Sequence, residues 1–206
     1  MSNLAQDLRY DNRKYEIINC NVVNMAPLAF ESHASIAGNI YGIFYTYLKG
    51  KRCKAYIDSM YVRLDKIKNV ILSDKNKNDK LIPDVMVVCN RDIIQNDGVY
   101  GAPDLVVEVL SKSTSARDKG IKKDLYEMIG VKEYWIVSVA ERTIEVYYLI
   151  DGKYMLYDTY HQYSEMEIEA IMDDVLTPDK TIITEFKTSI FDDLVIKIED
   201  IFDKLD

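Results

Sequence analysis

Two acidic residues in the middle of the chain have the type and the setting that metal-dependent hydrolysis requires. Asp84 follows Pro83 and opens the apolar run VMVV, and Glu108 lies inside a second apolar run, LVVEVLS, which follows Pro103-Asp104. An unpaired carboxylate inside an apolar strand costs on the order of several kcal/mol. Glu108 therefore needs a compensating partner, which could be a metal ion, a lysine or a water-filled cleft.

Strand geometry decides which aspartate can act together with Glu108. Side chains two residues apart share a face of a strand, so Asp104 and Glu108 point the same way, but a rise of ~3.3 Å per residue separates them by about 13 Å. They cannot hold one ion together. Asp84 is the natural partner of Glu108 if the two apolar runs pair. We interpret Asp104 as a residue that starts a strand, because Pro-Asp is common at such positions.

Two converging carboxylates suit Mg²⁺ or Mn²⁺, which prefer oxygen ligands. Such an ion can polarise a phosphoryl oxygen and activate water, and a nearby lysine can stabilise the charge that develops. The helix predicted over residues 115–129 offers Lys119, Lys122 and Lys123. Two alternatives stay open. Glu108 could be a structural carboxylate paired with a lysine or a backbone amide, and Lys122 could form an exposed pair with Asp118, four residues earlier.

Composition favours one globular domain in a reducing compartment. The chain has 206 residues, of which 48% are apolar and 29% charged, so wholesale disorder is excluded. Three widely spaced cysteines, Cys20, Cys53 and Cys89, indicate neither a disulfide framework nor a zinc site. The N-terminal residues lack the apolar core of a signal peptide, and no run of about 18 apolar residues occurs. We expect a cytoplasmic protein with no membrane association.

The net charge of −8 is concentrated near the C-terminus. Residues 1–150 contain 21 Lys and Arg against 19 Asp and Glu, a net of +2, whereas residues 151–206 contain 5 against 15, a net of −10. The larger part of the chain could therefore present a locally positive face to a polyanion.

Hydrophobic periodicity and turn residues predict a mixed α/β fold. A helix is expected from Glu31 to Leu48, where apolar residues recur at three- and four-residue spacing, and a hairpin is expected at Asp151-Gly152. The remaining expected elements are strands within 13–25, at 53–64, 83–89, 104–110 and 133–140, the helix at 115–129, a strand near Ile182, and a short amphipathic helix at 194–202. The central order is helix, three strands, helix, strand.

These residues resemble the Uma-two family of restriction-endonuclease-like proteins, within the superfamily of PD-(D/E)XK phosphodiesterases. The resemblance spans nearly the whole chain and fades after about residue 165. Its motifs are YEII at 15–18, His33, Pro83-Asp84-Val85, GAPDLVVEVLS at 101–111, Asp118, Lys122, Tyr126, GVKEYW at 130–135 and Val146-Tyr147. It implies an α/β fold with a restriction-endonuclease-like core, a mixed central sheet flanked by helices, and extra strands at both ends. We expect one domain over 1–206, with its core at about 31–140 and an acidic extension at about 151–206.

The resemblance also implies roles for individual residues. Asp84 and Glu108 become the metal-binding carboxylates. The superfamily's usual lysine, two residues after the glutamate, falls on Leu110, and the family's matching lysine on the following helix is Lys122. Three accessory candidates are His33 near the cleft, Glu31 at the helix start, and Tyr126, which we interpret chiefly as a packing residue with a hydrogen-bonding tip.

The function that this pattern predicts is a metal-dependent endonuclease that hydrolyses phosphodiester bonds in DNA. The expected cofactor is Mg²⁺ or Mn²⁺ and the expected partner is DNA. A homodimer is expected, because cutting both strands of a duplex usually needs two sites. Two alternatives remain: a binding or interaction module that keeps the scaffold without chemistry, and a hydrolase of small phosphorylated metabolites.

Overall fold

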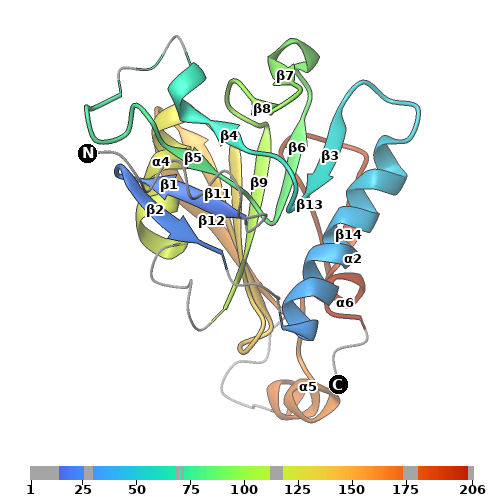
Figure 1. Cartoon of the computed structure of the whole chain (residues 1–206). Coiled ribbons are helices and arrows are strands. Elements are labelled where there is room, and N and C mark those ends of the chain that lie inside the picture. Colours follow the sequence, from blue (N-terminus) through green and yellow to red (C-terminus); the bar gives the residue numbers. More distant parts are fainter. Residues whose placement is uncertain are drawn as a thin grey trace.

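A computed structural model describes residues 14–25, 30–67, 70, 72–111, 118–173 and 181–203. At its centre lies a six-stranded sheet with the strand order β12-β11-β10-β9-β6-β3 (Figure 1). In this central sheet β9 and β10 run parallel and the other neighbours run antiparallel. Its strands are β3 (Lys54–Ile57), β6 (Val85–Val88), β9 (Leu105–Leu110), β10 (Glu133–Ser138), β11 (Thr143–Ile150) and β12 (Lys153–His161). The predicted mixed α/β sheet is confirmed.

The other elements cover the two faces of the central sheet. Helix α2 lies on one side and helix α4 on the other (Figure 1). A second sheet, of short strands, has the order β2-β1-β5-β4-β8-β7, and a third contains β13 and β14. These strands are β1 (Tyr15–Ile18), β2 (Asn21–Asn24), β4 (Val62–Arg63), β5 (Lys80–Leu81), β7 (Ile94–Gln95), β8 (Gly98–Val99), β13 (Glu185–Lys187) and β14 (Val195–Lys197). The helices and helical turns are α2 (Glu31–Leu48), η1 (Leu64–Lys66), η2 (Arg91–Ile93), η3 (Asp118–Lys122), α4 (Lys123–Ile129), α5 (Glu165–Met172) and α6 (Ile198–Ile201).

Helix α2 has the bounds that its periodicity predicts. Ile36, Ile40 and Phe44 follow one another at four-residue spacing and form one buried stripe. Gly50, with φ +79°, follows the helix in the left-handed conformation that glycine adopts without a Cβ clash. The predicted end of the helix at Leu48 is therefore confirmed.

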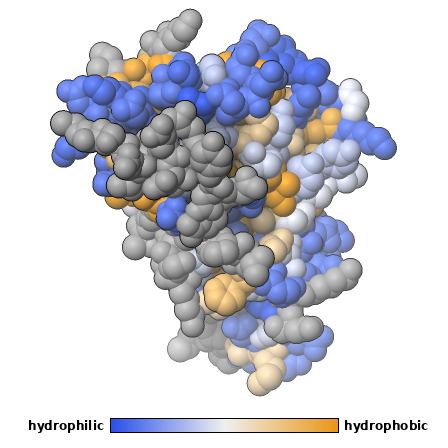
Figure 2. Space-filling view, viewed as in Figure 1, coloured by the Kyte–Doolittle hydropathy of each residue, from blue (hydrophilic) through white to orange (hydrophobic). Residues whose placement is uncertain are grey.

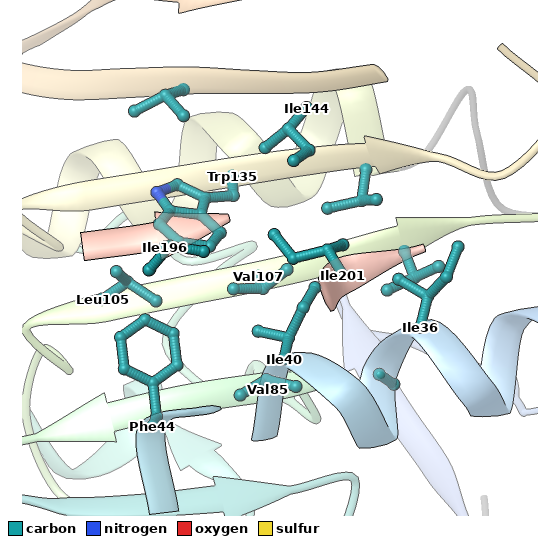
Figure 3. Close-up of a cluster of buried hydrophobic side chains, with 14 of the residues drawn as sticks. Ile36, Ile40, Phe44, Val85, Leu105, Val107, Trp135, Ile144, Ile196 and Ile201 are labelled. Atoms are coloured by element: carbon teal, nitrogen blue, oxygen red, sulfur yellow. The ribbon is translucent and has the colours of Figure 1, made fainter. Parts of the chain in front are cut away.

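The stripe of α2 packs against one face of the central sheet (Figure 3). Val85 of β6, Val107 of β9 and Trp135 of β10 supply the sheet side of this core, and all three are fully buried. Ile196 and Ile201, from the C-terminal β14 and α6, complete it. The C-terminal elements are thus part of the main core, although they lie far from α2 in the sequence.

The opposite face of the sheet carries a second core. Met86 of β6 and Val106 of β9 belong to this core, because neighbouring residues of a strand point to opposite faces. They cluster with Tyr126 of α4 and with Val62 and Leu81 of the short-stranded sheet. The short sheet and α4 therefore share this face, which is also the face of Glu108.

Two predicted segments are divided differently in the structure. The expected strand at 53–64 ends at Ile57, because Asp58 has a φ of +33° that no extended strand allows, and the chain then passes into the short-stranded sheet as β4. The strand expected near Ile182 lies further on, as β13. The first part of the helix expected at 194–202 is strand β14, and only Ile198–Ile201 are helical.

The expected hairpin turn at Asp151-Gly152 is present, and a second turn that was not predicted lies at Asn19-Cys20. Asp151 and Gly152, between β11 and β12, have φ values of +50° and +78°. Asn19 and Cys20, between β1 and β2, have φ values of +51° and +63°. Positive φ at both central residues is the requirement of the two-residue hairpin turn whose twist matches that of the flanking strands.

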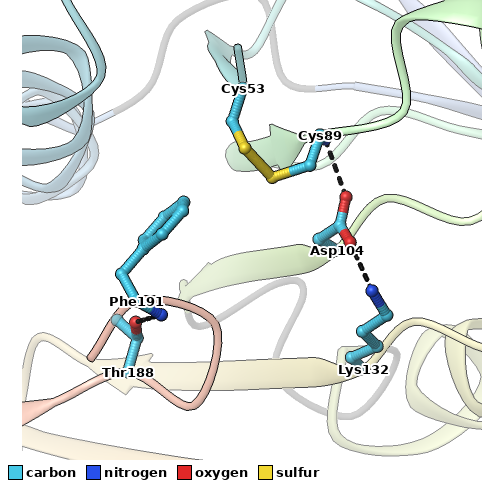
Figure 4. The surroundings of a disulfide bond; sticks show 6 residues. All are labelled: Cys53, Cys89, Asp104, Lys132, Thr188 and Phe191. Carbon is cyan, nitrogen blue, oxygen red and sulfur yellow. Dashed lines mark hydrogen bonds and ion pairs between the residues drawn. A yellow bond between two sulfur atoms is a disulfide. The ribbon is translucent and has the colours of Figure 1, made fainter. Parts of the chain in front are cut away.

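A disulfide joins Cys53 and Cys89 (Figure 4), so the interpretation of the cysteines as unpaired is wrong. Cys53 precedes β3, Cys89 follows β6, and the register pairs their neighbours Lys54 and Val88. The antiparallel ladder therefore brings the two cysteines opposite each other. Their separation of 36 residues in the sequence contains no sign of this pairing. Cys20 is exposed and outside any disulfide.

Hydrophilic residues dominate the upper edge of the face shown in Figure 2, around β7 and β8, and hydrophobic residues form separate spots on it. None of the helices in the described ranges is long and apolar enough to span a membrane.

Glu133 fastens the C-terminal segment to the central sheet. Its side chain is fully buried and accepts hydrogen bonds from Trp135 Nε1 at 2.7 Å and from Ser189 N and Oγ at 2.7 and 2.6 Å. Burial raises the pKa of the Glu133 carboxyl, and the hydrogen bonds from Ser189 and Trp135 offset this rise only in part.

The raised pKa of Glu133 predicts a specific pH dependence of stability. The folded protein binds the proton of Glu133 more tightly than the unfolded chain does, so the contribution is present below the ordinary pKa of 4.5 and is lost as the pH rises through the folded-state pKa. We expect the free energy of unfolding of the wild type, relative to Glu133→Gln, to fall as the pH rises above the ordinary pKa of 4.5. Urea denaturation at several pH values measures this, with the exposed Glu141→Gln as control. A difference that does not change with pH would contradict the prediction.

Candidate active site

Asp84 and Glu108 lie opposite each other on neighbouring strands. The register of β6 and β9 ends with the pair Val85 and Val107, and Asp84 and Glu108 are the next residue on each side of that pair. Opposed residues of an antiparallel pair have Cα atoms about 4.5–5.5 Å apart and side chains on the same face. Only 7% of Asp84 and 2% of Glu108 are exposed to solvent. The two carboxylates predicted to act together are thus neighbours in a buried position.

The contacts of Asp84 fall on one of its carboxylate oxygens. Oδ2 accepts a hydrogen bond from Val109 N at 2.7 Å and lies 3.3 Å from His33 Nε2. Across the ranges that the structure describes, Oδ1 accepts no hydrogen bond. The backbone oxygen of Asp84 accepts from Asp58 N at 2.9 Å, which ties it to the end of β3. Asp84 is held in place by Oδ2 and the backbone, so Oδ1 is the oxygen available to a further ligand.

Lys122 supplies the compensating partner that Glu108 requires. Its Nζ lies 2.6 Å from Glu108 Oε1, and the same oxygen accepts a hydrogen bond from Tyr126 OH at 2.9 Å. Lys122 is 3% exposed and Tyr126 is fully buried. The interpretation of Lys122 as half of an exposed pair is therefore wrong, since the residue is buried. The structure does contain a contact between Glu108 and a lysine, Lys122, as the structural alternative for Glu108 expected.

Glu16 of β1 is a member of this cluster that the sequence interpretation missed. Its Oε1 lies 3.1 Å from Lys122 Nζ and accepts a hydrogen bond from Ile82 N at 2.9 Å. The residue is 1% exposed. The signal was present in the motif YEII, because Glu16 shares the inward face of β1 with the buried Ile18. A carboxylate on the apolar face of a strand is the same signal that identified Glu108.

The helical segment after β9 places Lys122 and Tyr126 over Glu108. Residues 118–122 form a π-helical turn, η3, and α4 continues from Lys123 to Ile129, where Gly130 ends it with φ +91°. Lys122 and Tyr126 are four residues apart, so they lie on one face of this segment. Short π-helical turns are frequent at functional sites. The helix start predicted at Ser115 falls outside the described residues.

Tyr126 acts as a hydrogen-bond donor in this cluster. Burial raises the pKa of its phenol well above the ordinary value of 10, and the nearby charges of Glu108 and Glu16 raise the pKa further. The phenol therefore keeps its proton and directs it at Glu108. Its ring packs against Tyr134, with ring centroids 5.4 Å apart. Packing and the hydrogen bond together hold the carboxylate of Glu108 in one orientation.

The remaining candidates divide between the site and its surroundings. His33 contacts Asp84, as described above. Glu31 is exposed and accepts a hydrogen bond from Ser35 Oγ at 2.7 Å. Asp104 belongs to the other end of β9, where it accepts from Cys89 N and contacts Lys132 Nζ, both at 2.7 Å (Figure 4). Its interpretation as a structural residue at a strand start agrees with these contacts.

The donor set fits a divalent ion that keeps much of its water shell. Over the described ranges, no three His, Cys, Asp or Glu side chains gather closely enough to enclose a metal ion, and Glu31 does not join the two carboxylates. Mg²⁺ is commonly held by one or two carboxylates, with water and phosphate oxygens as the other ligands. Three carboxyl groups, of Glu16, Asp84 and Glu108, are buried here beside one amino group, of Lys122, so acidic groups outnumber basic ones by two in this set. One divalent cation would balance this excess of acidic groups.

Removing the lysine should leave two buried carboxylates without their cation. We expect Lys122→Met to lower the free energy of unfolding by about 3–5 kcal/mol, the usual cost of breaking a buried ion pair from one side. The matched control is Lys132→Met, which removes the exposed partner of Asp104 and should cost at most about 1 kcal/mol. Urea denaturation measures both. Equal losses in the two variants would show that Lys122 has no special electrostatic role.

Comparisons with known proteins assign the chain to a family. The family model Uma2, described as "Putative restriction endonuclease", matches residues 3–177. The uncharacterized protein slr1290 of Synechocystis sp. is 27% identical over 142 residues, which are 68% of this chain and 70% of that protein. The crystal structure of "a putative nuclease belonging to DUF820" from Anabaena variabilis superposes with a TM-score of 0.64 over 98% of both chains, at 16% identity. This chain thus shares the fold of the Anabaena protein. Because the family model matches most of this chain, the chain belongs to the Uma2 family.

Proposed function

We propose that the protein is a metal-dependent endonuclease that hydrolyses phosphodiester bonds in DNA. The observation that carries the proposal is the buried pair of opposed carboxylates, Asp84 and Glu108, with Lys122 Nζ 2.6 Å from Glu108. Buried ionisable groups in mutual contact are frequent at functional sites. The descriptions of the family and of the similar structure, which both name nucleases, support the same reaction class.

The order of elements supports a restriction-endonuclease-like core. Helix α2 is followed in the central sheet by β3, β6 and β9, then by α4 and β10. This is the order of helix, three strands, helix and strand that the PD-(D/E)XK resemblance implies. Asp84 precedes the second of these strands and Glu108 lies within the third, so both carboxylates occupy the positions that the resemblance assigns to metal ligands.

Each residue of the cluster has a chemical role in this proposal. Asp84 and Glu108 hold Mg²⁺ or Mn²⁺, which supplies Lewis acidity and a more acidic bound water. Lys122 brings a positive charge that stabilises the negative charge developing on the phosphate. Tyr126 fixes the orientation of Glu108, and His33 that of Asp84. A homodimer is the proposed assembly, because two sites are needed to cut both strands of a duplex.

A second candidate is a binding module without chemistry. The favouring observation is that Lys122 Nζ lies 2.6 Å from Glu108 Oε1, so a side chain of the protein itself can compensate the buried carboxylate. A hydrolase of small phosphorylated metabolites would use the same groups on another phosphate ester, and the family description favours DNA over it.

Plasmid cleavage tests the enzyme proposal. Purified protein should nick or linearise supercoiled DNA with Mg²⁺ or Mn²⁺ and not with EDTA. Asp84→Asn and Glu108→Gln should each reduce the rate by about a hundredfold or more, since an ion that contributes several kcal/mol of charge stabilisation loses a ligand. Asp104→Asn, at the other end of β9, should cleave at nearly the wild-type rate. Equal background cleavage by the wild type and both site variants would refute the enzyme and favour the binding module.

A further inference from the structure

Among the described residues, Lys122 contacts the carboxylates of Glu108 and Glu16, which offer two alternative ion-pair positions for its ammonium group. Its Nζ lies 2.6 Å from Glu108 Oε1 and 3.1 Å from Glu16 Oε1. All three residues are at most 3% exposed. A buried ammonium that loses one partner must find another, because an uncompensated charge in this setting is strongly destabilising. Glu16 gives Lys122 that second partner without exposure to water.

Glu16 is fixed by its own surroundings and does not follow Lys122. Its Oε1 accepts a hydrogen bond from Ile82 N at 2.9 Å, and its strand β1 is paired with β2 on one side and β5 on the other. Ile82 stands two residues before Asp84, so the same carboxylate also positions the segment that carries the proposed metal ligand. The Glu16 carboxylate, anchored in this way, stays in place when the Lys122 ammonium group moves.

The Glu108 carboxylate cannot pair closely with Lys122 and bind a divalent ion at the same time without repulsion between the two cations. Its Oε1 already receives Lys122 Nζ and the hydroxyl of Tyr126. An ion bound to this carboxylate would lie a few ångströms from the ammonium group, where two like charges with little water between them repel strongly. The repulsion favours an arrangement in which Lys122 withdraws from Glu108.

We propose that Lys122 is an internal cation that occupies Glu108 in the metal-free protein and transfers its ion pair to Glu16 when Glu108 takes a divalent ion. Glu16 is then a positioning residue: it holds the Lys122 side chain beside the site in the metal-bound state. This inference rests on the proposed function for the identity of the ion as Mg²⁺ or Mn²⁺. It adds that metal affinity is set by a competition between two cations.

Calorimetric titration with Mn²⁺, on the folded full-length protein without DNA, tests the exchange. Lys122→Met removes the competing cation and should bind Mn²⁺ about tenfold more tightly than the wild type. Glu16→Gln keeps an oxygen that can accept a hydrogen bond from Ile82 N, but it removes the second carboxylate that Lys122 can pair with. This variant should bind Mn²⁺ about tenfold more weakly than the wild type. Two controls should leave the affinity unchanged: Lys132→Met, a lysine paired with Asp104, and Glu133→Gln, a buried carboxylate at the other end of the sheet.

A second measurement keeps the test decisive if Lys122→Met does not fold. In the wild type, the ¹⁵N resonance of Lys122 Nζ should shift on titration with diamagnetic Mg²⁺, and the shift should be largely lost in Glu16→Gln. The neighbouring Lys123, whose Nζ lies 3.7 Å from the ring centre of Tyr147, serves as the internal reference.

The outcomes separate this inference from the proposed function. Opposite changes in Mn²⁺ affinity for the two variants support the exchange, whether or not DNA is the substrate. Weaker or unchanged binding by Lys122→Met, or unchanged binding by Glu16→Gln, overturns the exchange while wild-type plasmid cleavage leaves the nuclease standing. A wild type that binds no Mn²⁺ at millimolar concentration overturns both.

Discussion

The buried charge of Glu108 is the constraint on which the rest of the site depends. A carboxylate inside a strand of the central sheet is tolerable only with compensation, and here Lys122 and Tyr126 converge on one of its oxygens. The helical segment that carries Lys122 and Tyr126 must therefore lie over this face at the position from which both side chains reach Glu108. The carboxylate of Glu16 also contacts Lys122. This contact links the short-stranded sheet, which contains Glu16, to the same face of the central sheet. Electrostatics and packing thus select the same arrangement.

The two faces of the central sheet have different tasks. Helix α2 and the C-terminal elements cover one face with apolar side chains. The opposite face combines an apolar core with the charged cluster. Asp84 stands between them: His33 of α2 contacts its carboxylate from one side, and Glu108 lies across from it on the other. The disulfide between Cys53 and Cys89 joins β3 to β6 at the end of β6 away from Asp84. The strand that Asp84 precedes is therefore held at both ends.

Local signals in the sequence predicted several elements well. The spacing of Ile36, Ile40 and Phe44 determined α2, and the turn at Asp151-Gly152 follows from residues that tolerate positive φ. Prediction failed where a neighbouring element overrides the local pattern. The run at 53–64 is apolar enough for one strand, yet the chain turns at Asp58 because β3 and β4 belong to different sheets. Residues of the tail alternate as β14 only because β13 is there to pair with them.

The family pattern and the chemical types at the site can be identified from the linear sequence: Asp84 at the start of one apolar run, Glu108 within the next, and Lys122 on the helix that follows. These follow from local composition and spacing, which a linear chain contains in full. Tertiary structure alone decided the partners. Glu16 of β1 reaches Lys122 of η3, 106 positions away, because the short-stranded sheet and the helical segment pack on the same face, and Cys53 reaches Cys89, 36 positions away, through the register of β3 and β6. Such registers depend on the fit of whole sheets and cores, so no single segment of the sequence contains them.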